Sequence, residues 1–171
     1  MISAQSELGK RAESGVRRDQ VRGREKRRDR SGGSRRAAMA THSAITYVSG
    51  TQLQRLQGPN IAVVDVRDDE RAFDGHIAGS MHFSSGSFEE KLPKLVEEVK
   101  NKETVVFHCS FSQVRGPTCA RILNAHLNTA VAEGKLEKVP NIVVLERGFN
   151  GWAESGRPIC SCQDLVCTHT A

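Results

Sequence analysis

Two hydrophobic patterns alternate along the chain after residue 44. Continuous apolar runs, typical of strands buried on both faces of a parallel sheet, occur at residues 61–66, 104–108 and 141–145. Apolar residues at helical spacing occur at 88–99 and through Ala120, Leu123 and Leu127. A short strand is expected at 45–48, with a capped helix after it, an exposed charged turn or short helix at 67–74, and a turn or helix at 148–152. This alternation predicts a single α/β domain with an open, mainly parallel sheet and helices on both faces.

Charge is distributed unevenly along the chain. The net charge of the whole chain is +5, but residues 1–40 alone carry +7 and residues 41–171 carry −2. Residues 1–40 also lack aromatic residues and contain a Ser-Gly-Gly-Ser stretch, so they are predicted to be a disordered basic tail. The basic run at 25–30 is either a solvated arm or a nuclear-localisation or nucleic-acid patch, and the acidic residues disfavour a transit peptide. A nucleic-acid partner is therefore not expected for the domain itself.

Three segments are expected: the tail (1–40), a catalytic domain (41–158) and a Cys-rich C-terminal extension (159–171). No apolar run is long enough to span a membrane, and the N-terminus lacks the apolar stretch of a secretory signal.

The five cysteines are an odd number with uneven spacing, which does not suggest a disulfide framework. The pattern indicates a reducing intracellular location, cytoplasmic or nuclear, with one reactive thiol.

The most informative stretch runs from His108 to Pro117, where a buried strand ends and a helix is expected to begin. Five residues separate Cys109 from Arg115, enough to curl the backbone into a cup whose N–H groups bind an oxyanion. A planar guanidinium closes such a cup well, because it offers two donors to two oxygens of a tetrahedral anion. The predicted oxyanion-binding loop comprises Ser110, Phe111, Ser112, Gln113, Val114 and Gly116.

Cys109 is the predicted nucleophile of this loop. The Arg115 cation, the loop amides and the helix dipole all favour the thiolate, which is the attacking form of cysteine. The alternative is an inert thiol at a strand end. His108 either orients the loop through hydrogen bonds or fills the strand end, and Cys119 is expected to be a buried apolar contact rather than a resolving thiol.

Three motifs carry a family resemblance. The segment from His108 to Pro117 resembles the loop of the cell-division-cycle dual-specificity phosphatases, which are built on the rhodanese fold. Residues 65–67 with 75–80, and residues 146–152, resemble the rhodanese-type turn and closing signature. With its small size and Cys-rich end, the chain looks most like the plant phosphatase-like arsenate reductases. The resemblance therefore implies a single rhodanese-like domain.

The resemblance also implies a reaction. The Cys109 thiolate would attack arsenate and release water or hydroxide, after which glutathione and glutaredoxin would return the enzyme and release arsenite. The same site could hydrolyse phosphotyrosine or phosphothreonine in a phosphoprotein. The alternatives are a cell-cycle protein phosphatase and a non-catalytic rhodanese-like binding module. A sulfurtransferase is disfavoured, because the family's sulfur-carrying loop is one residue shorter.

Two positions depart from the phosphatase pattern. Val66 stands where those phosphatases carry a second cysteine, so an oxidised Cys109 would need an external thiol such as glutathione. No general-acid aspartate is evident from the motif. Asp65 is a candidate acid, although an Asp at a buried strand end before Arg67 is more often structural. A missing acid would hinder expulsion of an alkoxide more than attack on arsenate.

The C-terminal extension contains candidate metal ligands. Cys160, Cys162, Cys167 and His169 supply four soft or borderline ligands within ten residues. Zn²⁺ takes four such ligands in structural sites, and plant relatives look similar in having a Cys-rich, zinc-binding end. The predicted cofactors are thus glutathione as co-substrate and structural zinc; the alternative is a frayed end with exposed thiols.

Overall fold

The computed structural model describes residues 44–169, so the predicted tail (1–40) lies outside the described residues. A five-stranded sheet has the order β1-β6-β5-β2-β4, and every pair of neighbours is parallel. Its strands are β1 (Thr46–Val48), β2 (Ile61–Asp65), β4 (Ser80–His82), β5 (Thr104–His108) and β6 (Asn141–Leu145). The helices are α1 (Gly50–Leu56), α2 (Glu70–Asp74), α3 (Phe88–Val99), α4 (Arg115–Ala132) and α5 (Gly148–Glu154), with a 3-10 turn η1 (Ser85–Ser87).

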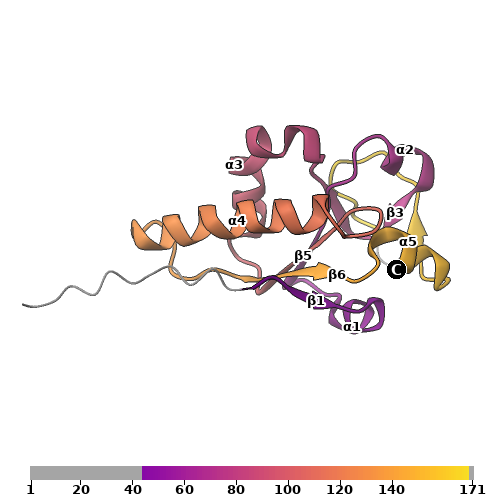
Figure 1. Ribbon diagram of the computed structural model, residues 1–171, viewed down its shortest axis with the longest axis horizontal. Coiled ribbons are helices and arrows are strands. Elements are labelled where there is room, and N and C mark those ends of the chain that lie inside the picture. Colours follow the sequence, from indigo (N-terminus) through magenta and orange to yellow (C-terminus); the bar gives the residue numbers. More distant parts are fainter. Residues whose placement is uncertain (1–43, 170–171) are drawn as a thin grey trace, which may run out of the picture. The chain divides into compact units, whose positions relative to one another are not determined.

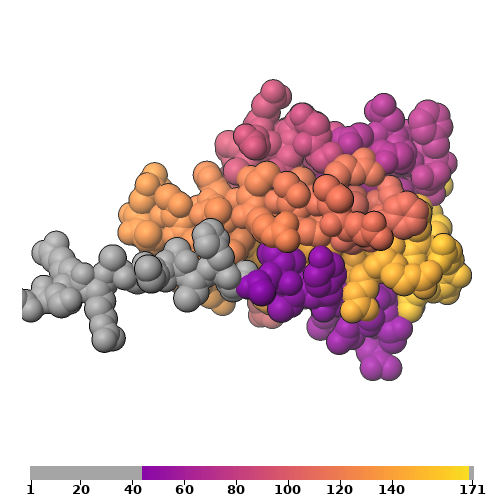
Figure 2. Space-filling view, in the orientation of Figure 1, coloured from indigo at the N-terminus to yellow at the C-terminus, as the bar shows by residue number. Residues whose placement is uncertain are grey.

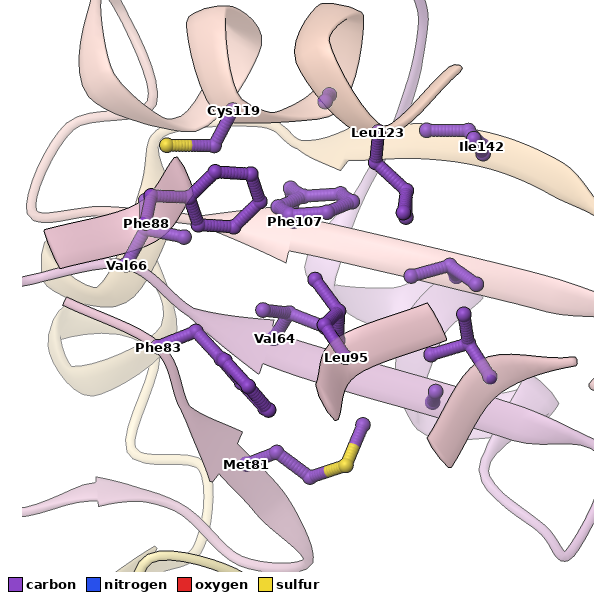
Figure 3. Packing of buried hydrophobic residues seen from close by; sticks show 14 of the residues in the cluster. Val64, Val66, Met81, Phe83, Phe88, Leu95, Phe107, Cys119, Leu123 and Ile142 are labelled. Carbon is purple, nitrogen blue, oxygen red and sulfur yellow. The ribbon is translucent and has the colours of Figure 1, made fainter. Parts of the chain in front are cut away.

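Alternate residues of the central strands bury their side chains on opposite faces of the sheet. On one face, Val105 and Phe107 of β5 pack with residues of α3 and α4, including Leu95 and Leu123 (Figure 3). On the other face, Val106 packs in a smaller cluster with residues of α1 and α5. Figure 1 shows α3 and α4 on one side of the sheet and α1 on the other. The predicted α/β class, with helices on both faces, is confirmed.

A second, two-stranded sheet attaches the C-terminal segment to the domain. In it β3 (His76–Ile77) pairs antiparallel with β7 (Ile159–Cys160). The segment beyond β7 continues along β4, where the Cys167 amide donates to the Ser80 carbonyl at 3.0 Å. Figure 2 shows this yellow segment at the same end of the molecule as the purple turn that carries α2. The end of the described chain is therefore bonded into the domain.

One sequence expectation about solvent exposure holds only in part. Residues 67–74 were expected to be an exposed charged turn or short helix, and α2 does form there. However, Arg67 and Arg71 are buried, because both reach inward to the Asp65 carboxylate. The Arg67 side chain also stacks on Phe149 of α5, with its guanidinium carbon 3.8 Å from the ring centroid. Among the described helices, none is long and apolar enough to cross a membrane.

Candidate active site

The Cys109–Arg115 loop lies at the carboxyl edge of the parallel sheet. It connects the end of β5 to the first residue of α4. Strand β2 pairs with β5 in a register that places Asp65 opposite His108. Because both strands end at the same level, the turn that follows β2 lies beside the loop that follows β5. This is the edge at which open α/β sheets bind ligands.

The loop curls around the sulfur of Cys109. The Ser112 backbone N–H donates to Cys109 Sγ at 3.2 Å, so this amide points inward. Ser112 has a φ of 55°, in the left-handed region, which reverses the chain at this point. Cys109 is 4% exposed and lies at the floor of the cup. An inward amide over a sulfur, at a helix N-terminus, is suited to bind an anion beside that sulfur.

Backbone amides at the start of α5 hold the loop through hydrogen bonds. The Phe149 and Asn150 amides donate to the carbonyls of Cys109 and Ser110 at 2.9 and 3.0 Å. Gly148 has a φ of +58°, and a Cβ there would lie 2.3 Å from the Cys109 carbonyl oxygen. Only glycine allows α5 to approach this closely. Sequence reasoning assigned this segment to the family signature but missed its contact with the loop.

Arg115 lies at the rim of the cup, bonded to two carboxylates. Its Nη1 donates to Asp68 at 2.9 Å, and its Nη2 donates to Glu70 at 2.6 Å and to the Ser110 hydroxyl at 3.1 Å. The Arg115 hydrogen bond is the main reason that the pKa of Glu70 falls to about 2. Sequence reasoning did not identify Asp68 or Glu70, since a charged turn gives no sign of what it will contact.

Asp65 and His108 lie beneath the loop, in the protein interior. Burial alone would raise the pKa of Asp65, but the neighbouring His108 and the hydrogen bonds of Arg67 outweigh it and lower this pKa to about 2. Asp65 is thus a buried carboxylate, held at 2.7 Å by the Arg67 guanidinium. Burial lowers the pKa of His108, and neither ring nitrogen has a hydrogen-bond partner among the described residues, the Nδ1 lying 3.9 Å from an Asp65 oxygen. Its surroundings are those of a side chain that fills the strand end.

The remaining loop residues face outward or pack inside. Phe111, Gln113 and Val114 are exposed, whereas Gly116 is buried behind Cys109. A cavity of about 550 Å³ adjoins the loop, lined by Phe111, Gln113 and residues of β1 and α5. Cys119 of α4 is buried, and burial raises its pKa to about 12. It therefore remains a protonated thiol at neutral pH.

A cluster of metal-ligating side chains forms where β3 meets the C-terminal segment. Ligand atoms of His76, Cys160, Cys162 and Cys167 all lie within 4.8 Å of one another. The three cysteines that the sequence analysis selected are thus brought together, but the fourth member of this set is His76 rather than His169. His169 is not part of this set, although its Nδ1 lies 3.4 Å from the Cys160 sulfur and 3.7 Å from the Cys167 sulfur. Sequence spacing could not reveal His76, because it precedes the cysteines by more than eighty residues and reaches them through the β3–β7 pairing.

One ligand distance in this cluster matches that of a zinc site. With Zn–S bonds of about 2.3 Å and Zn–N bonds of about 2.0 Å, tetrahedral ligand atoms stand roughly 3.5–3.8 Å apart. His76 Nε2 lies 3.5 Å from Cys162 Sγ, within that range. The Nδ1 of His76 is buried and has no hydrogen-bond partner among the described residues. A Cys₃His set is a standard donor set for structural zinc.

Comparison with known proteins shows the family. A family model described as a rhodanese-like domain matches residues 50–155. The chain belongs to the rhodanese-like domain family. Rhodanese-like architecture accounts for the parallel sheet, the loop after β5 and the closing turn into α5, which together build the site described above. The predicted single rhodanese-like domain is confirmed.

Relatives within the rhodanese-like family have two kinds of names. The chain is 55% identical over 124 residues to "Arsenate reductase 2.2" of Oryza sativa, covering 72% of this chain and 93% of that protein. It is 51% identical over 135 residues to "Dual specificity phosphatase Cdc25" of Arabidopsis thaliana, covering 78% and 90%. Among solved structures, an As-Sb reductase from Leishmania major superposes with a TM-score of 0.54 at 32% identity, covering 66% and 80%. The expected resemblance to plant arsenate reductases and cell-cycle-type phosphatases is confirmed.

Proposed function

We propose that this protein reduces arsenate to arsenite, using Cys109 as the nucleophile and Arg115 with the loop amides as the oxyanion site. The observation that carries this proposal is the Ser112 amide pointing at the Cys109 sulfur, with Arg115 at the rim of the same loop. The names of the rice and Leishmania relatives support arsenate as the oxyanion.

In the first step, the Cys109 thiolate attacks arsenic. An As–S bond forms, one As–O bond breaks, and the departing oxygen leaves as hydroxide or, after taking a proton from solvent, as water. The remaining oxygens of the adduct carry negative charge, which the loop amides and Arg115 stabilise by hydrogen bonds that need no rearrangement during the reaction. The leaving group is small and hydrated, so this step does not require a buried general acid.

In the second step, arsenic takes up two electrons. A glutathione thiolate attacks the Cys109 sulfur and breaks the As–S bond, whose electron pair stays on arsenic and reduces As(V) to As(III). Arsenite departs and leaves a Cys109–glutathione disulfide, which a glutaredoxin thiolate then resolves by exchange. Neither Val66 nor Cys119 can resolve the disulfide from within the protein, because Val66 is not a cysteine and Cys119 is a buried protonated thiol. This supports an external thiol as the reductant.

Protein phosphatase activity is the second candidate, favoured by the name of the Arabidopsis relative. A phospho-Cys109 intermediate needs the same oxyanion site but must expel an alkoxide or phenoxide. Asp68 and Glu70 are bonded to Arg115 and Asp65 lies beneath the loop, and contacts with arginines or other donors lower the pKa of all three. None of them is held protonated to act as a general acid. Phosphatase turnover should therefore be the weaker activity, limited to good leaving groups.

The Cys-rich end is proposed to hold structural zinc through His76, Cys160, Cys162 and Cys167. When bound, zinc would crosslink the C-terminal segment to β3 and stabilise that part of the fold. Arg71 connects this segment to the active-site turn, since its Nη2 donates to the Asp164 carbonyl at 3.3 Å and its Nε lies 3.8 Å from Asp65. The ligand set is closed by four protein groups, as in structural rather than catalytic zinc sites.

The experiment that tests this function compares two assays on one preparation. The first measures arsenate-dependent NADPH oxidation with glutathione, glutaredoxin and glutathione reductase; the second measures hydrolysis of an aryl phosphate. The wild type should reduce arsenate, and Cys109→Ser should lose at least a thousandfold of this activity. Arsenate reduction that survives in Cys109→Ser, or a wild type that only hydrolyses phosphate esters, would contradict the proposal. A wild type inactive in both assays would favour a non-catalytic binding module.

A further inference from the structure

Both terminal nitrogens of Arg115 are already hydrogen-bonded without any oxyanion. Arginine has five N–H groups, four of them on its two terminal nitrogens. Nη1 makes hydrogen bonds to Asp68 and Glu70 at 2.9 and 3.3 Å, and Nη2 makes bonds to Glu70 and Ser110 at 2.6 and 3.1 Å. Only the Nε–H has no partner among the described residues. A bidentate contact to an oxyanion requires two N–H groups, so one terminal nitrogen has to release a bond first.

Both carboxylates are held in place by groups other than Arg115. Asp68 accepts hydrogen bonds from the hydroxyls of Ser84 and Ser85 and from the Gly86 amide. Glu70 accepts one from the Asp68 amide at 3.0 Å. None of these bonds involves Arg115. The arginine is therefore the part that moves, and its side chain, 30% exposed at the first residue of α4, has room to rotate.

We propose that Asp68 and Glu70 determine the oxyanion affinity of this site, by holding Arg115 in a resting position from which only an anion that also engages the loop amides displaces it. This proposal rests on the oxyanion-binding loop of the proposed function and adds two specificity-determining residues to it. A tetrahedral oxyanion recovers the lost bonds through Arg115 and the cup together. A small anion such as chloride cannot contact Arg115 and the loop amides together. The hydrogen bonds that it forms therefore stabilise the complex less than the lost Arg115–carboxylate bonds stabilised the free site.

The cost of displacement appears as reduced apparent affinity. When only a fraction of molecules has Arg115 free, the observed dissociation constant is the intrinsic one divided by that fraction. Glu70→Gln removes a charge-assisted, two-nitrogen contact and should shift Arg115 toward the free position. For a partly exposed ion pair the expected gain in oxyanion affinity is about fivefold.

The test measures protection of Cys109 against alkylation. Iodoacetamide modifies Cys109, the extent is followed on the Cys109 peptide by mass spectrometry, and inorganic phosphate or arsenate is titrated against the rate. Each variant is referred to its own unprotected rate. Asp69→Asn is the matched control, since Asp69 is exposed on the same turn, carries the same charge, and its side chain makes no hydrogen bond or ion pair within residues 44–169.

Glu70→Gln should bind both oxyanions about fivefold more tightly, with a correspondingly lower KM for arsenate, while Asp69→Asn changes affinity less than twofold. Unchanged or weaker protection in Glu70→Gln would overturn the proposal, because it would mean that Glu70 only supports Arg115. An equal gain in affinity in Asp69→Asn would also overturn the proposal. The gain would then come from removing one negative charge near the site and not from releasing Arg115. The readout is independent of turnover: if the wild type fails to reduce arsenate but Glu70→Gln still tightens protection, the proposed function fails and this inference stands.

Discussion

Replacement of Gly148 by alanine tests how the closing turn supports the catalytic loop. Gly148 begins α5 with a φ of +58°, and the added Cβ would lie 2.3 Å from the Cys109 carbonyl oxygen and 2.6 Å from that of Ser110. Both neighbours are backbone atoms, which cannot rotate away as a side chain end can. Either α5 or the loop must therefore move.

The expected cost has two parts. Placing an L-residue in the left-handed region costs about 1–2 kcal/mol, and forcing an extra methyl group into a packed site costs about 1–3 kcal/mol. Gly148→Ala should thus lower the free energy of unfolding by about 2–5 kcal/mol. Gly134 separates the two parts, because its φ is +72° but an added Cβ there would have no neighbouring atom within 4 Å. Gly134→Ala should show only the first part.

Urea unfolding monitored by the fluorescence of Trp152, the only tryptophan, supplies the stability difference. The rate of Cys109 alkylation and the arsenate reductase activity report on the loop in the same samples. We expect Gly148→Ala to change both, because the Cys109 carbonyl must shift, and Gly134→Ala to change neither. Equal destabilisation by the two substitutions, with an unaltered loop in Gly148→Ala, would refute the reasoning.

The remaining predictions concern the buried carboxylate and the metal cluster. Asp65→Asn removes the buried carboxylate that pairs with Arg67 at 2.7 Å and should lower the free energy of unfolding by about 3–5 kcal/mol in urea at pH 7. Folding lowers the pKa of Asp65 from 3.8 to about 2. The ionised carboxylate therefore adds to the free energy of unfolding above pH 4, and this contribution is lost as the pH falls toward 2. Acid titration of stability should therefore show a smaller loss in Asp65→Asn than in the wild type, and an equal loss would count against this role. For zinc, elemental analysis should find one ion per wild-type chain, retained in His169→Ala and lost in His76→Ala; the reverse pattern would reinstate the sequence-based ligand set. Removing zinc with a chelator should lower the melting temperature of the wild type but not that of His76→Ala.

The fold was predictable because its signals are local. The apolar runs that became β2, β5 and β6 differ visibly from the helical spacing of α3, and their alternation along the chain is enough to indicate a parallel sheet. The loop was predictable for the same reason. Cys109 and Arg115 are close in sequence, and the strand and helix that flank them determine where the backbone must turn.

Contacts between distant segments were not predictable. Glu70 meets Arg115 because β2 and β5 are neighbours in the sheet, which sequence periodicity does not reveal. His76 joins the cysteines through β3 and β7, strands of two residues each that are too short to give a pattern. The burial of Arg67 was hidden because a charged residue is ordinarily exposed, and only its pairing with Asp65 makes burial acceptable.

The central claim is that Cys109 itself carries the arsenic and then the glutathione. Intact-protein and peptide mass spectrometry on enzyme given arsenate and glutathione, with glutaredoxin omitted, tests it most directly, together with arsenite measured in the same sample. The account predicts a single glutathione disulfide on Cys109 and an equimolar amount of arsenite, with neither product in Cys109→Ser. Arsenite formed by Cys109→Ser, or an arsenate-dependent disulfide on another cysteine with Cys109 unmodified, would contradict it.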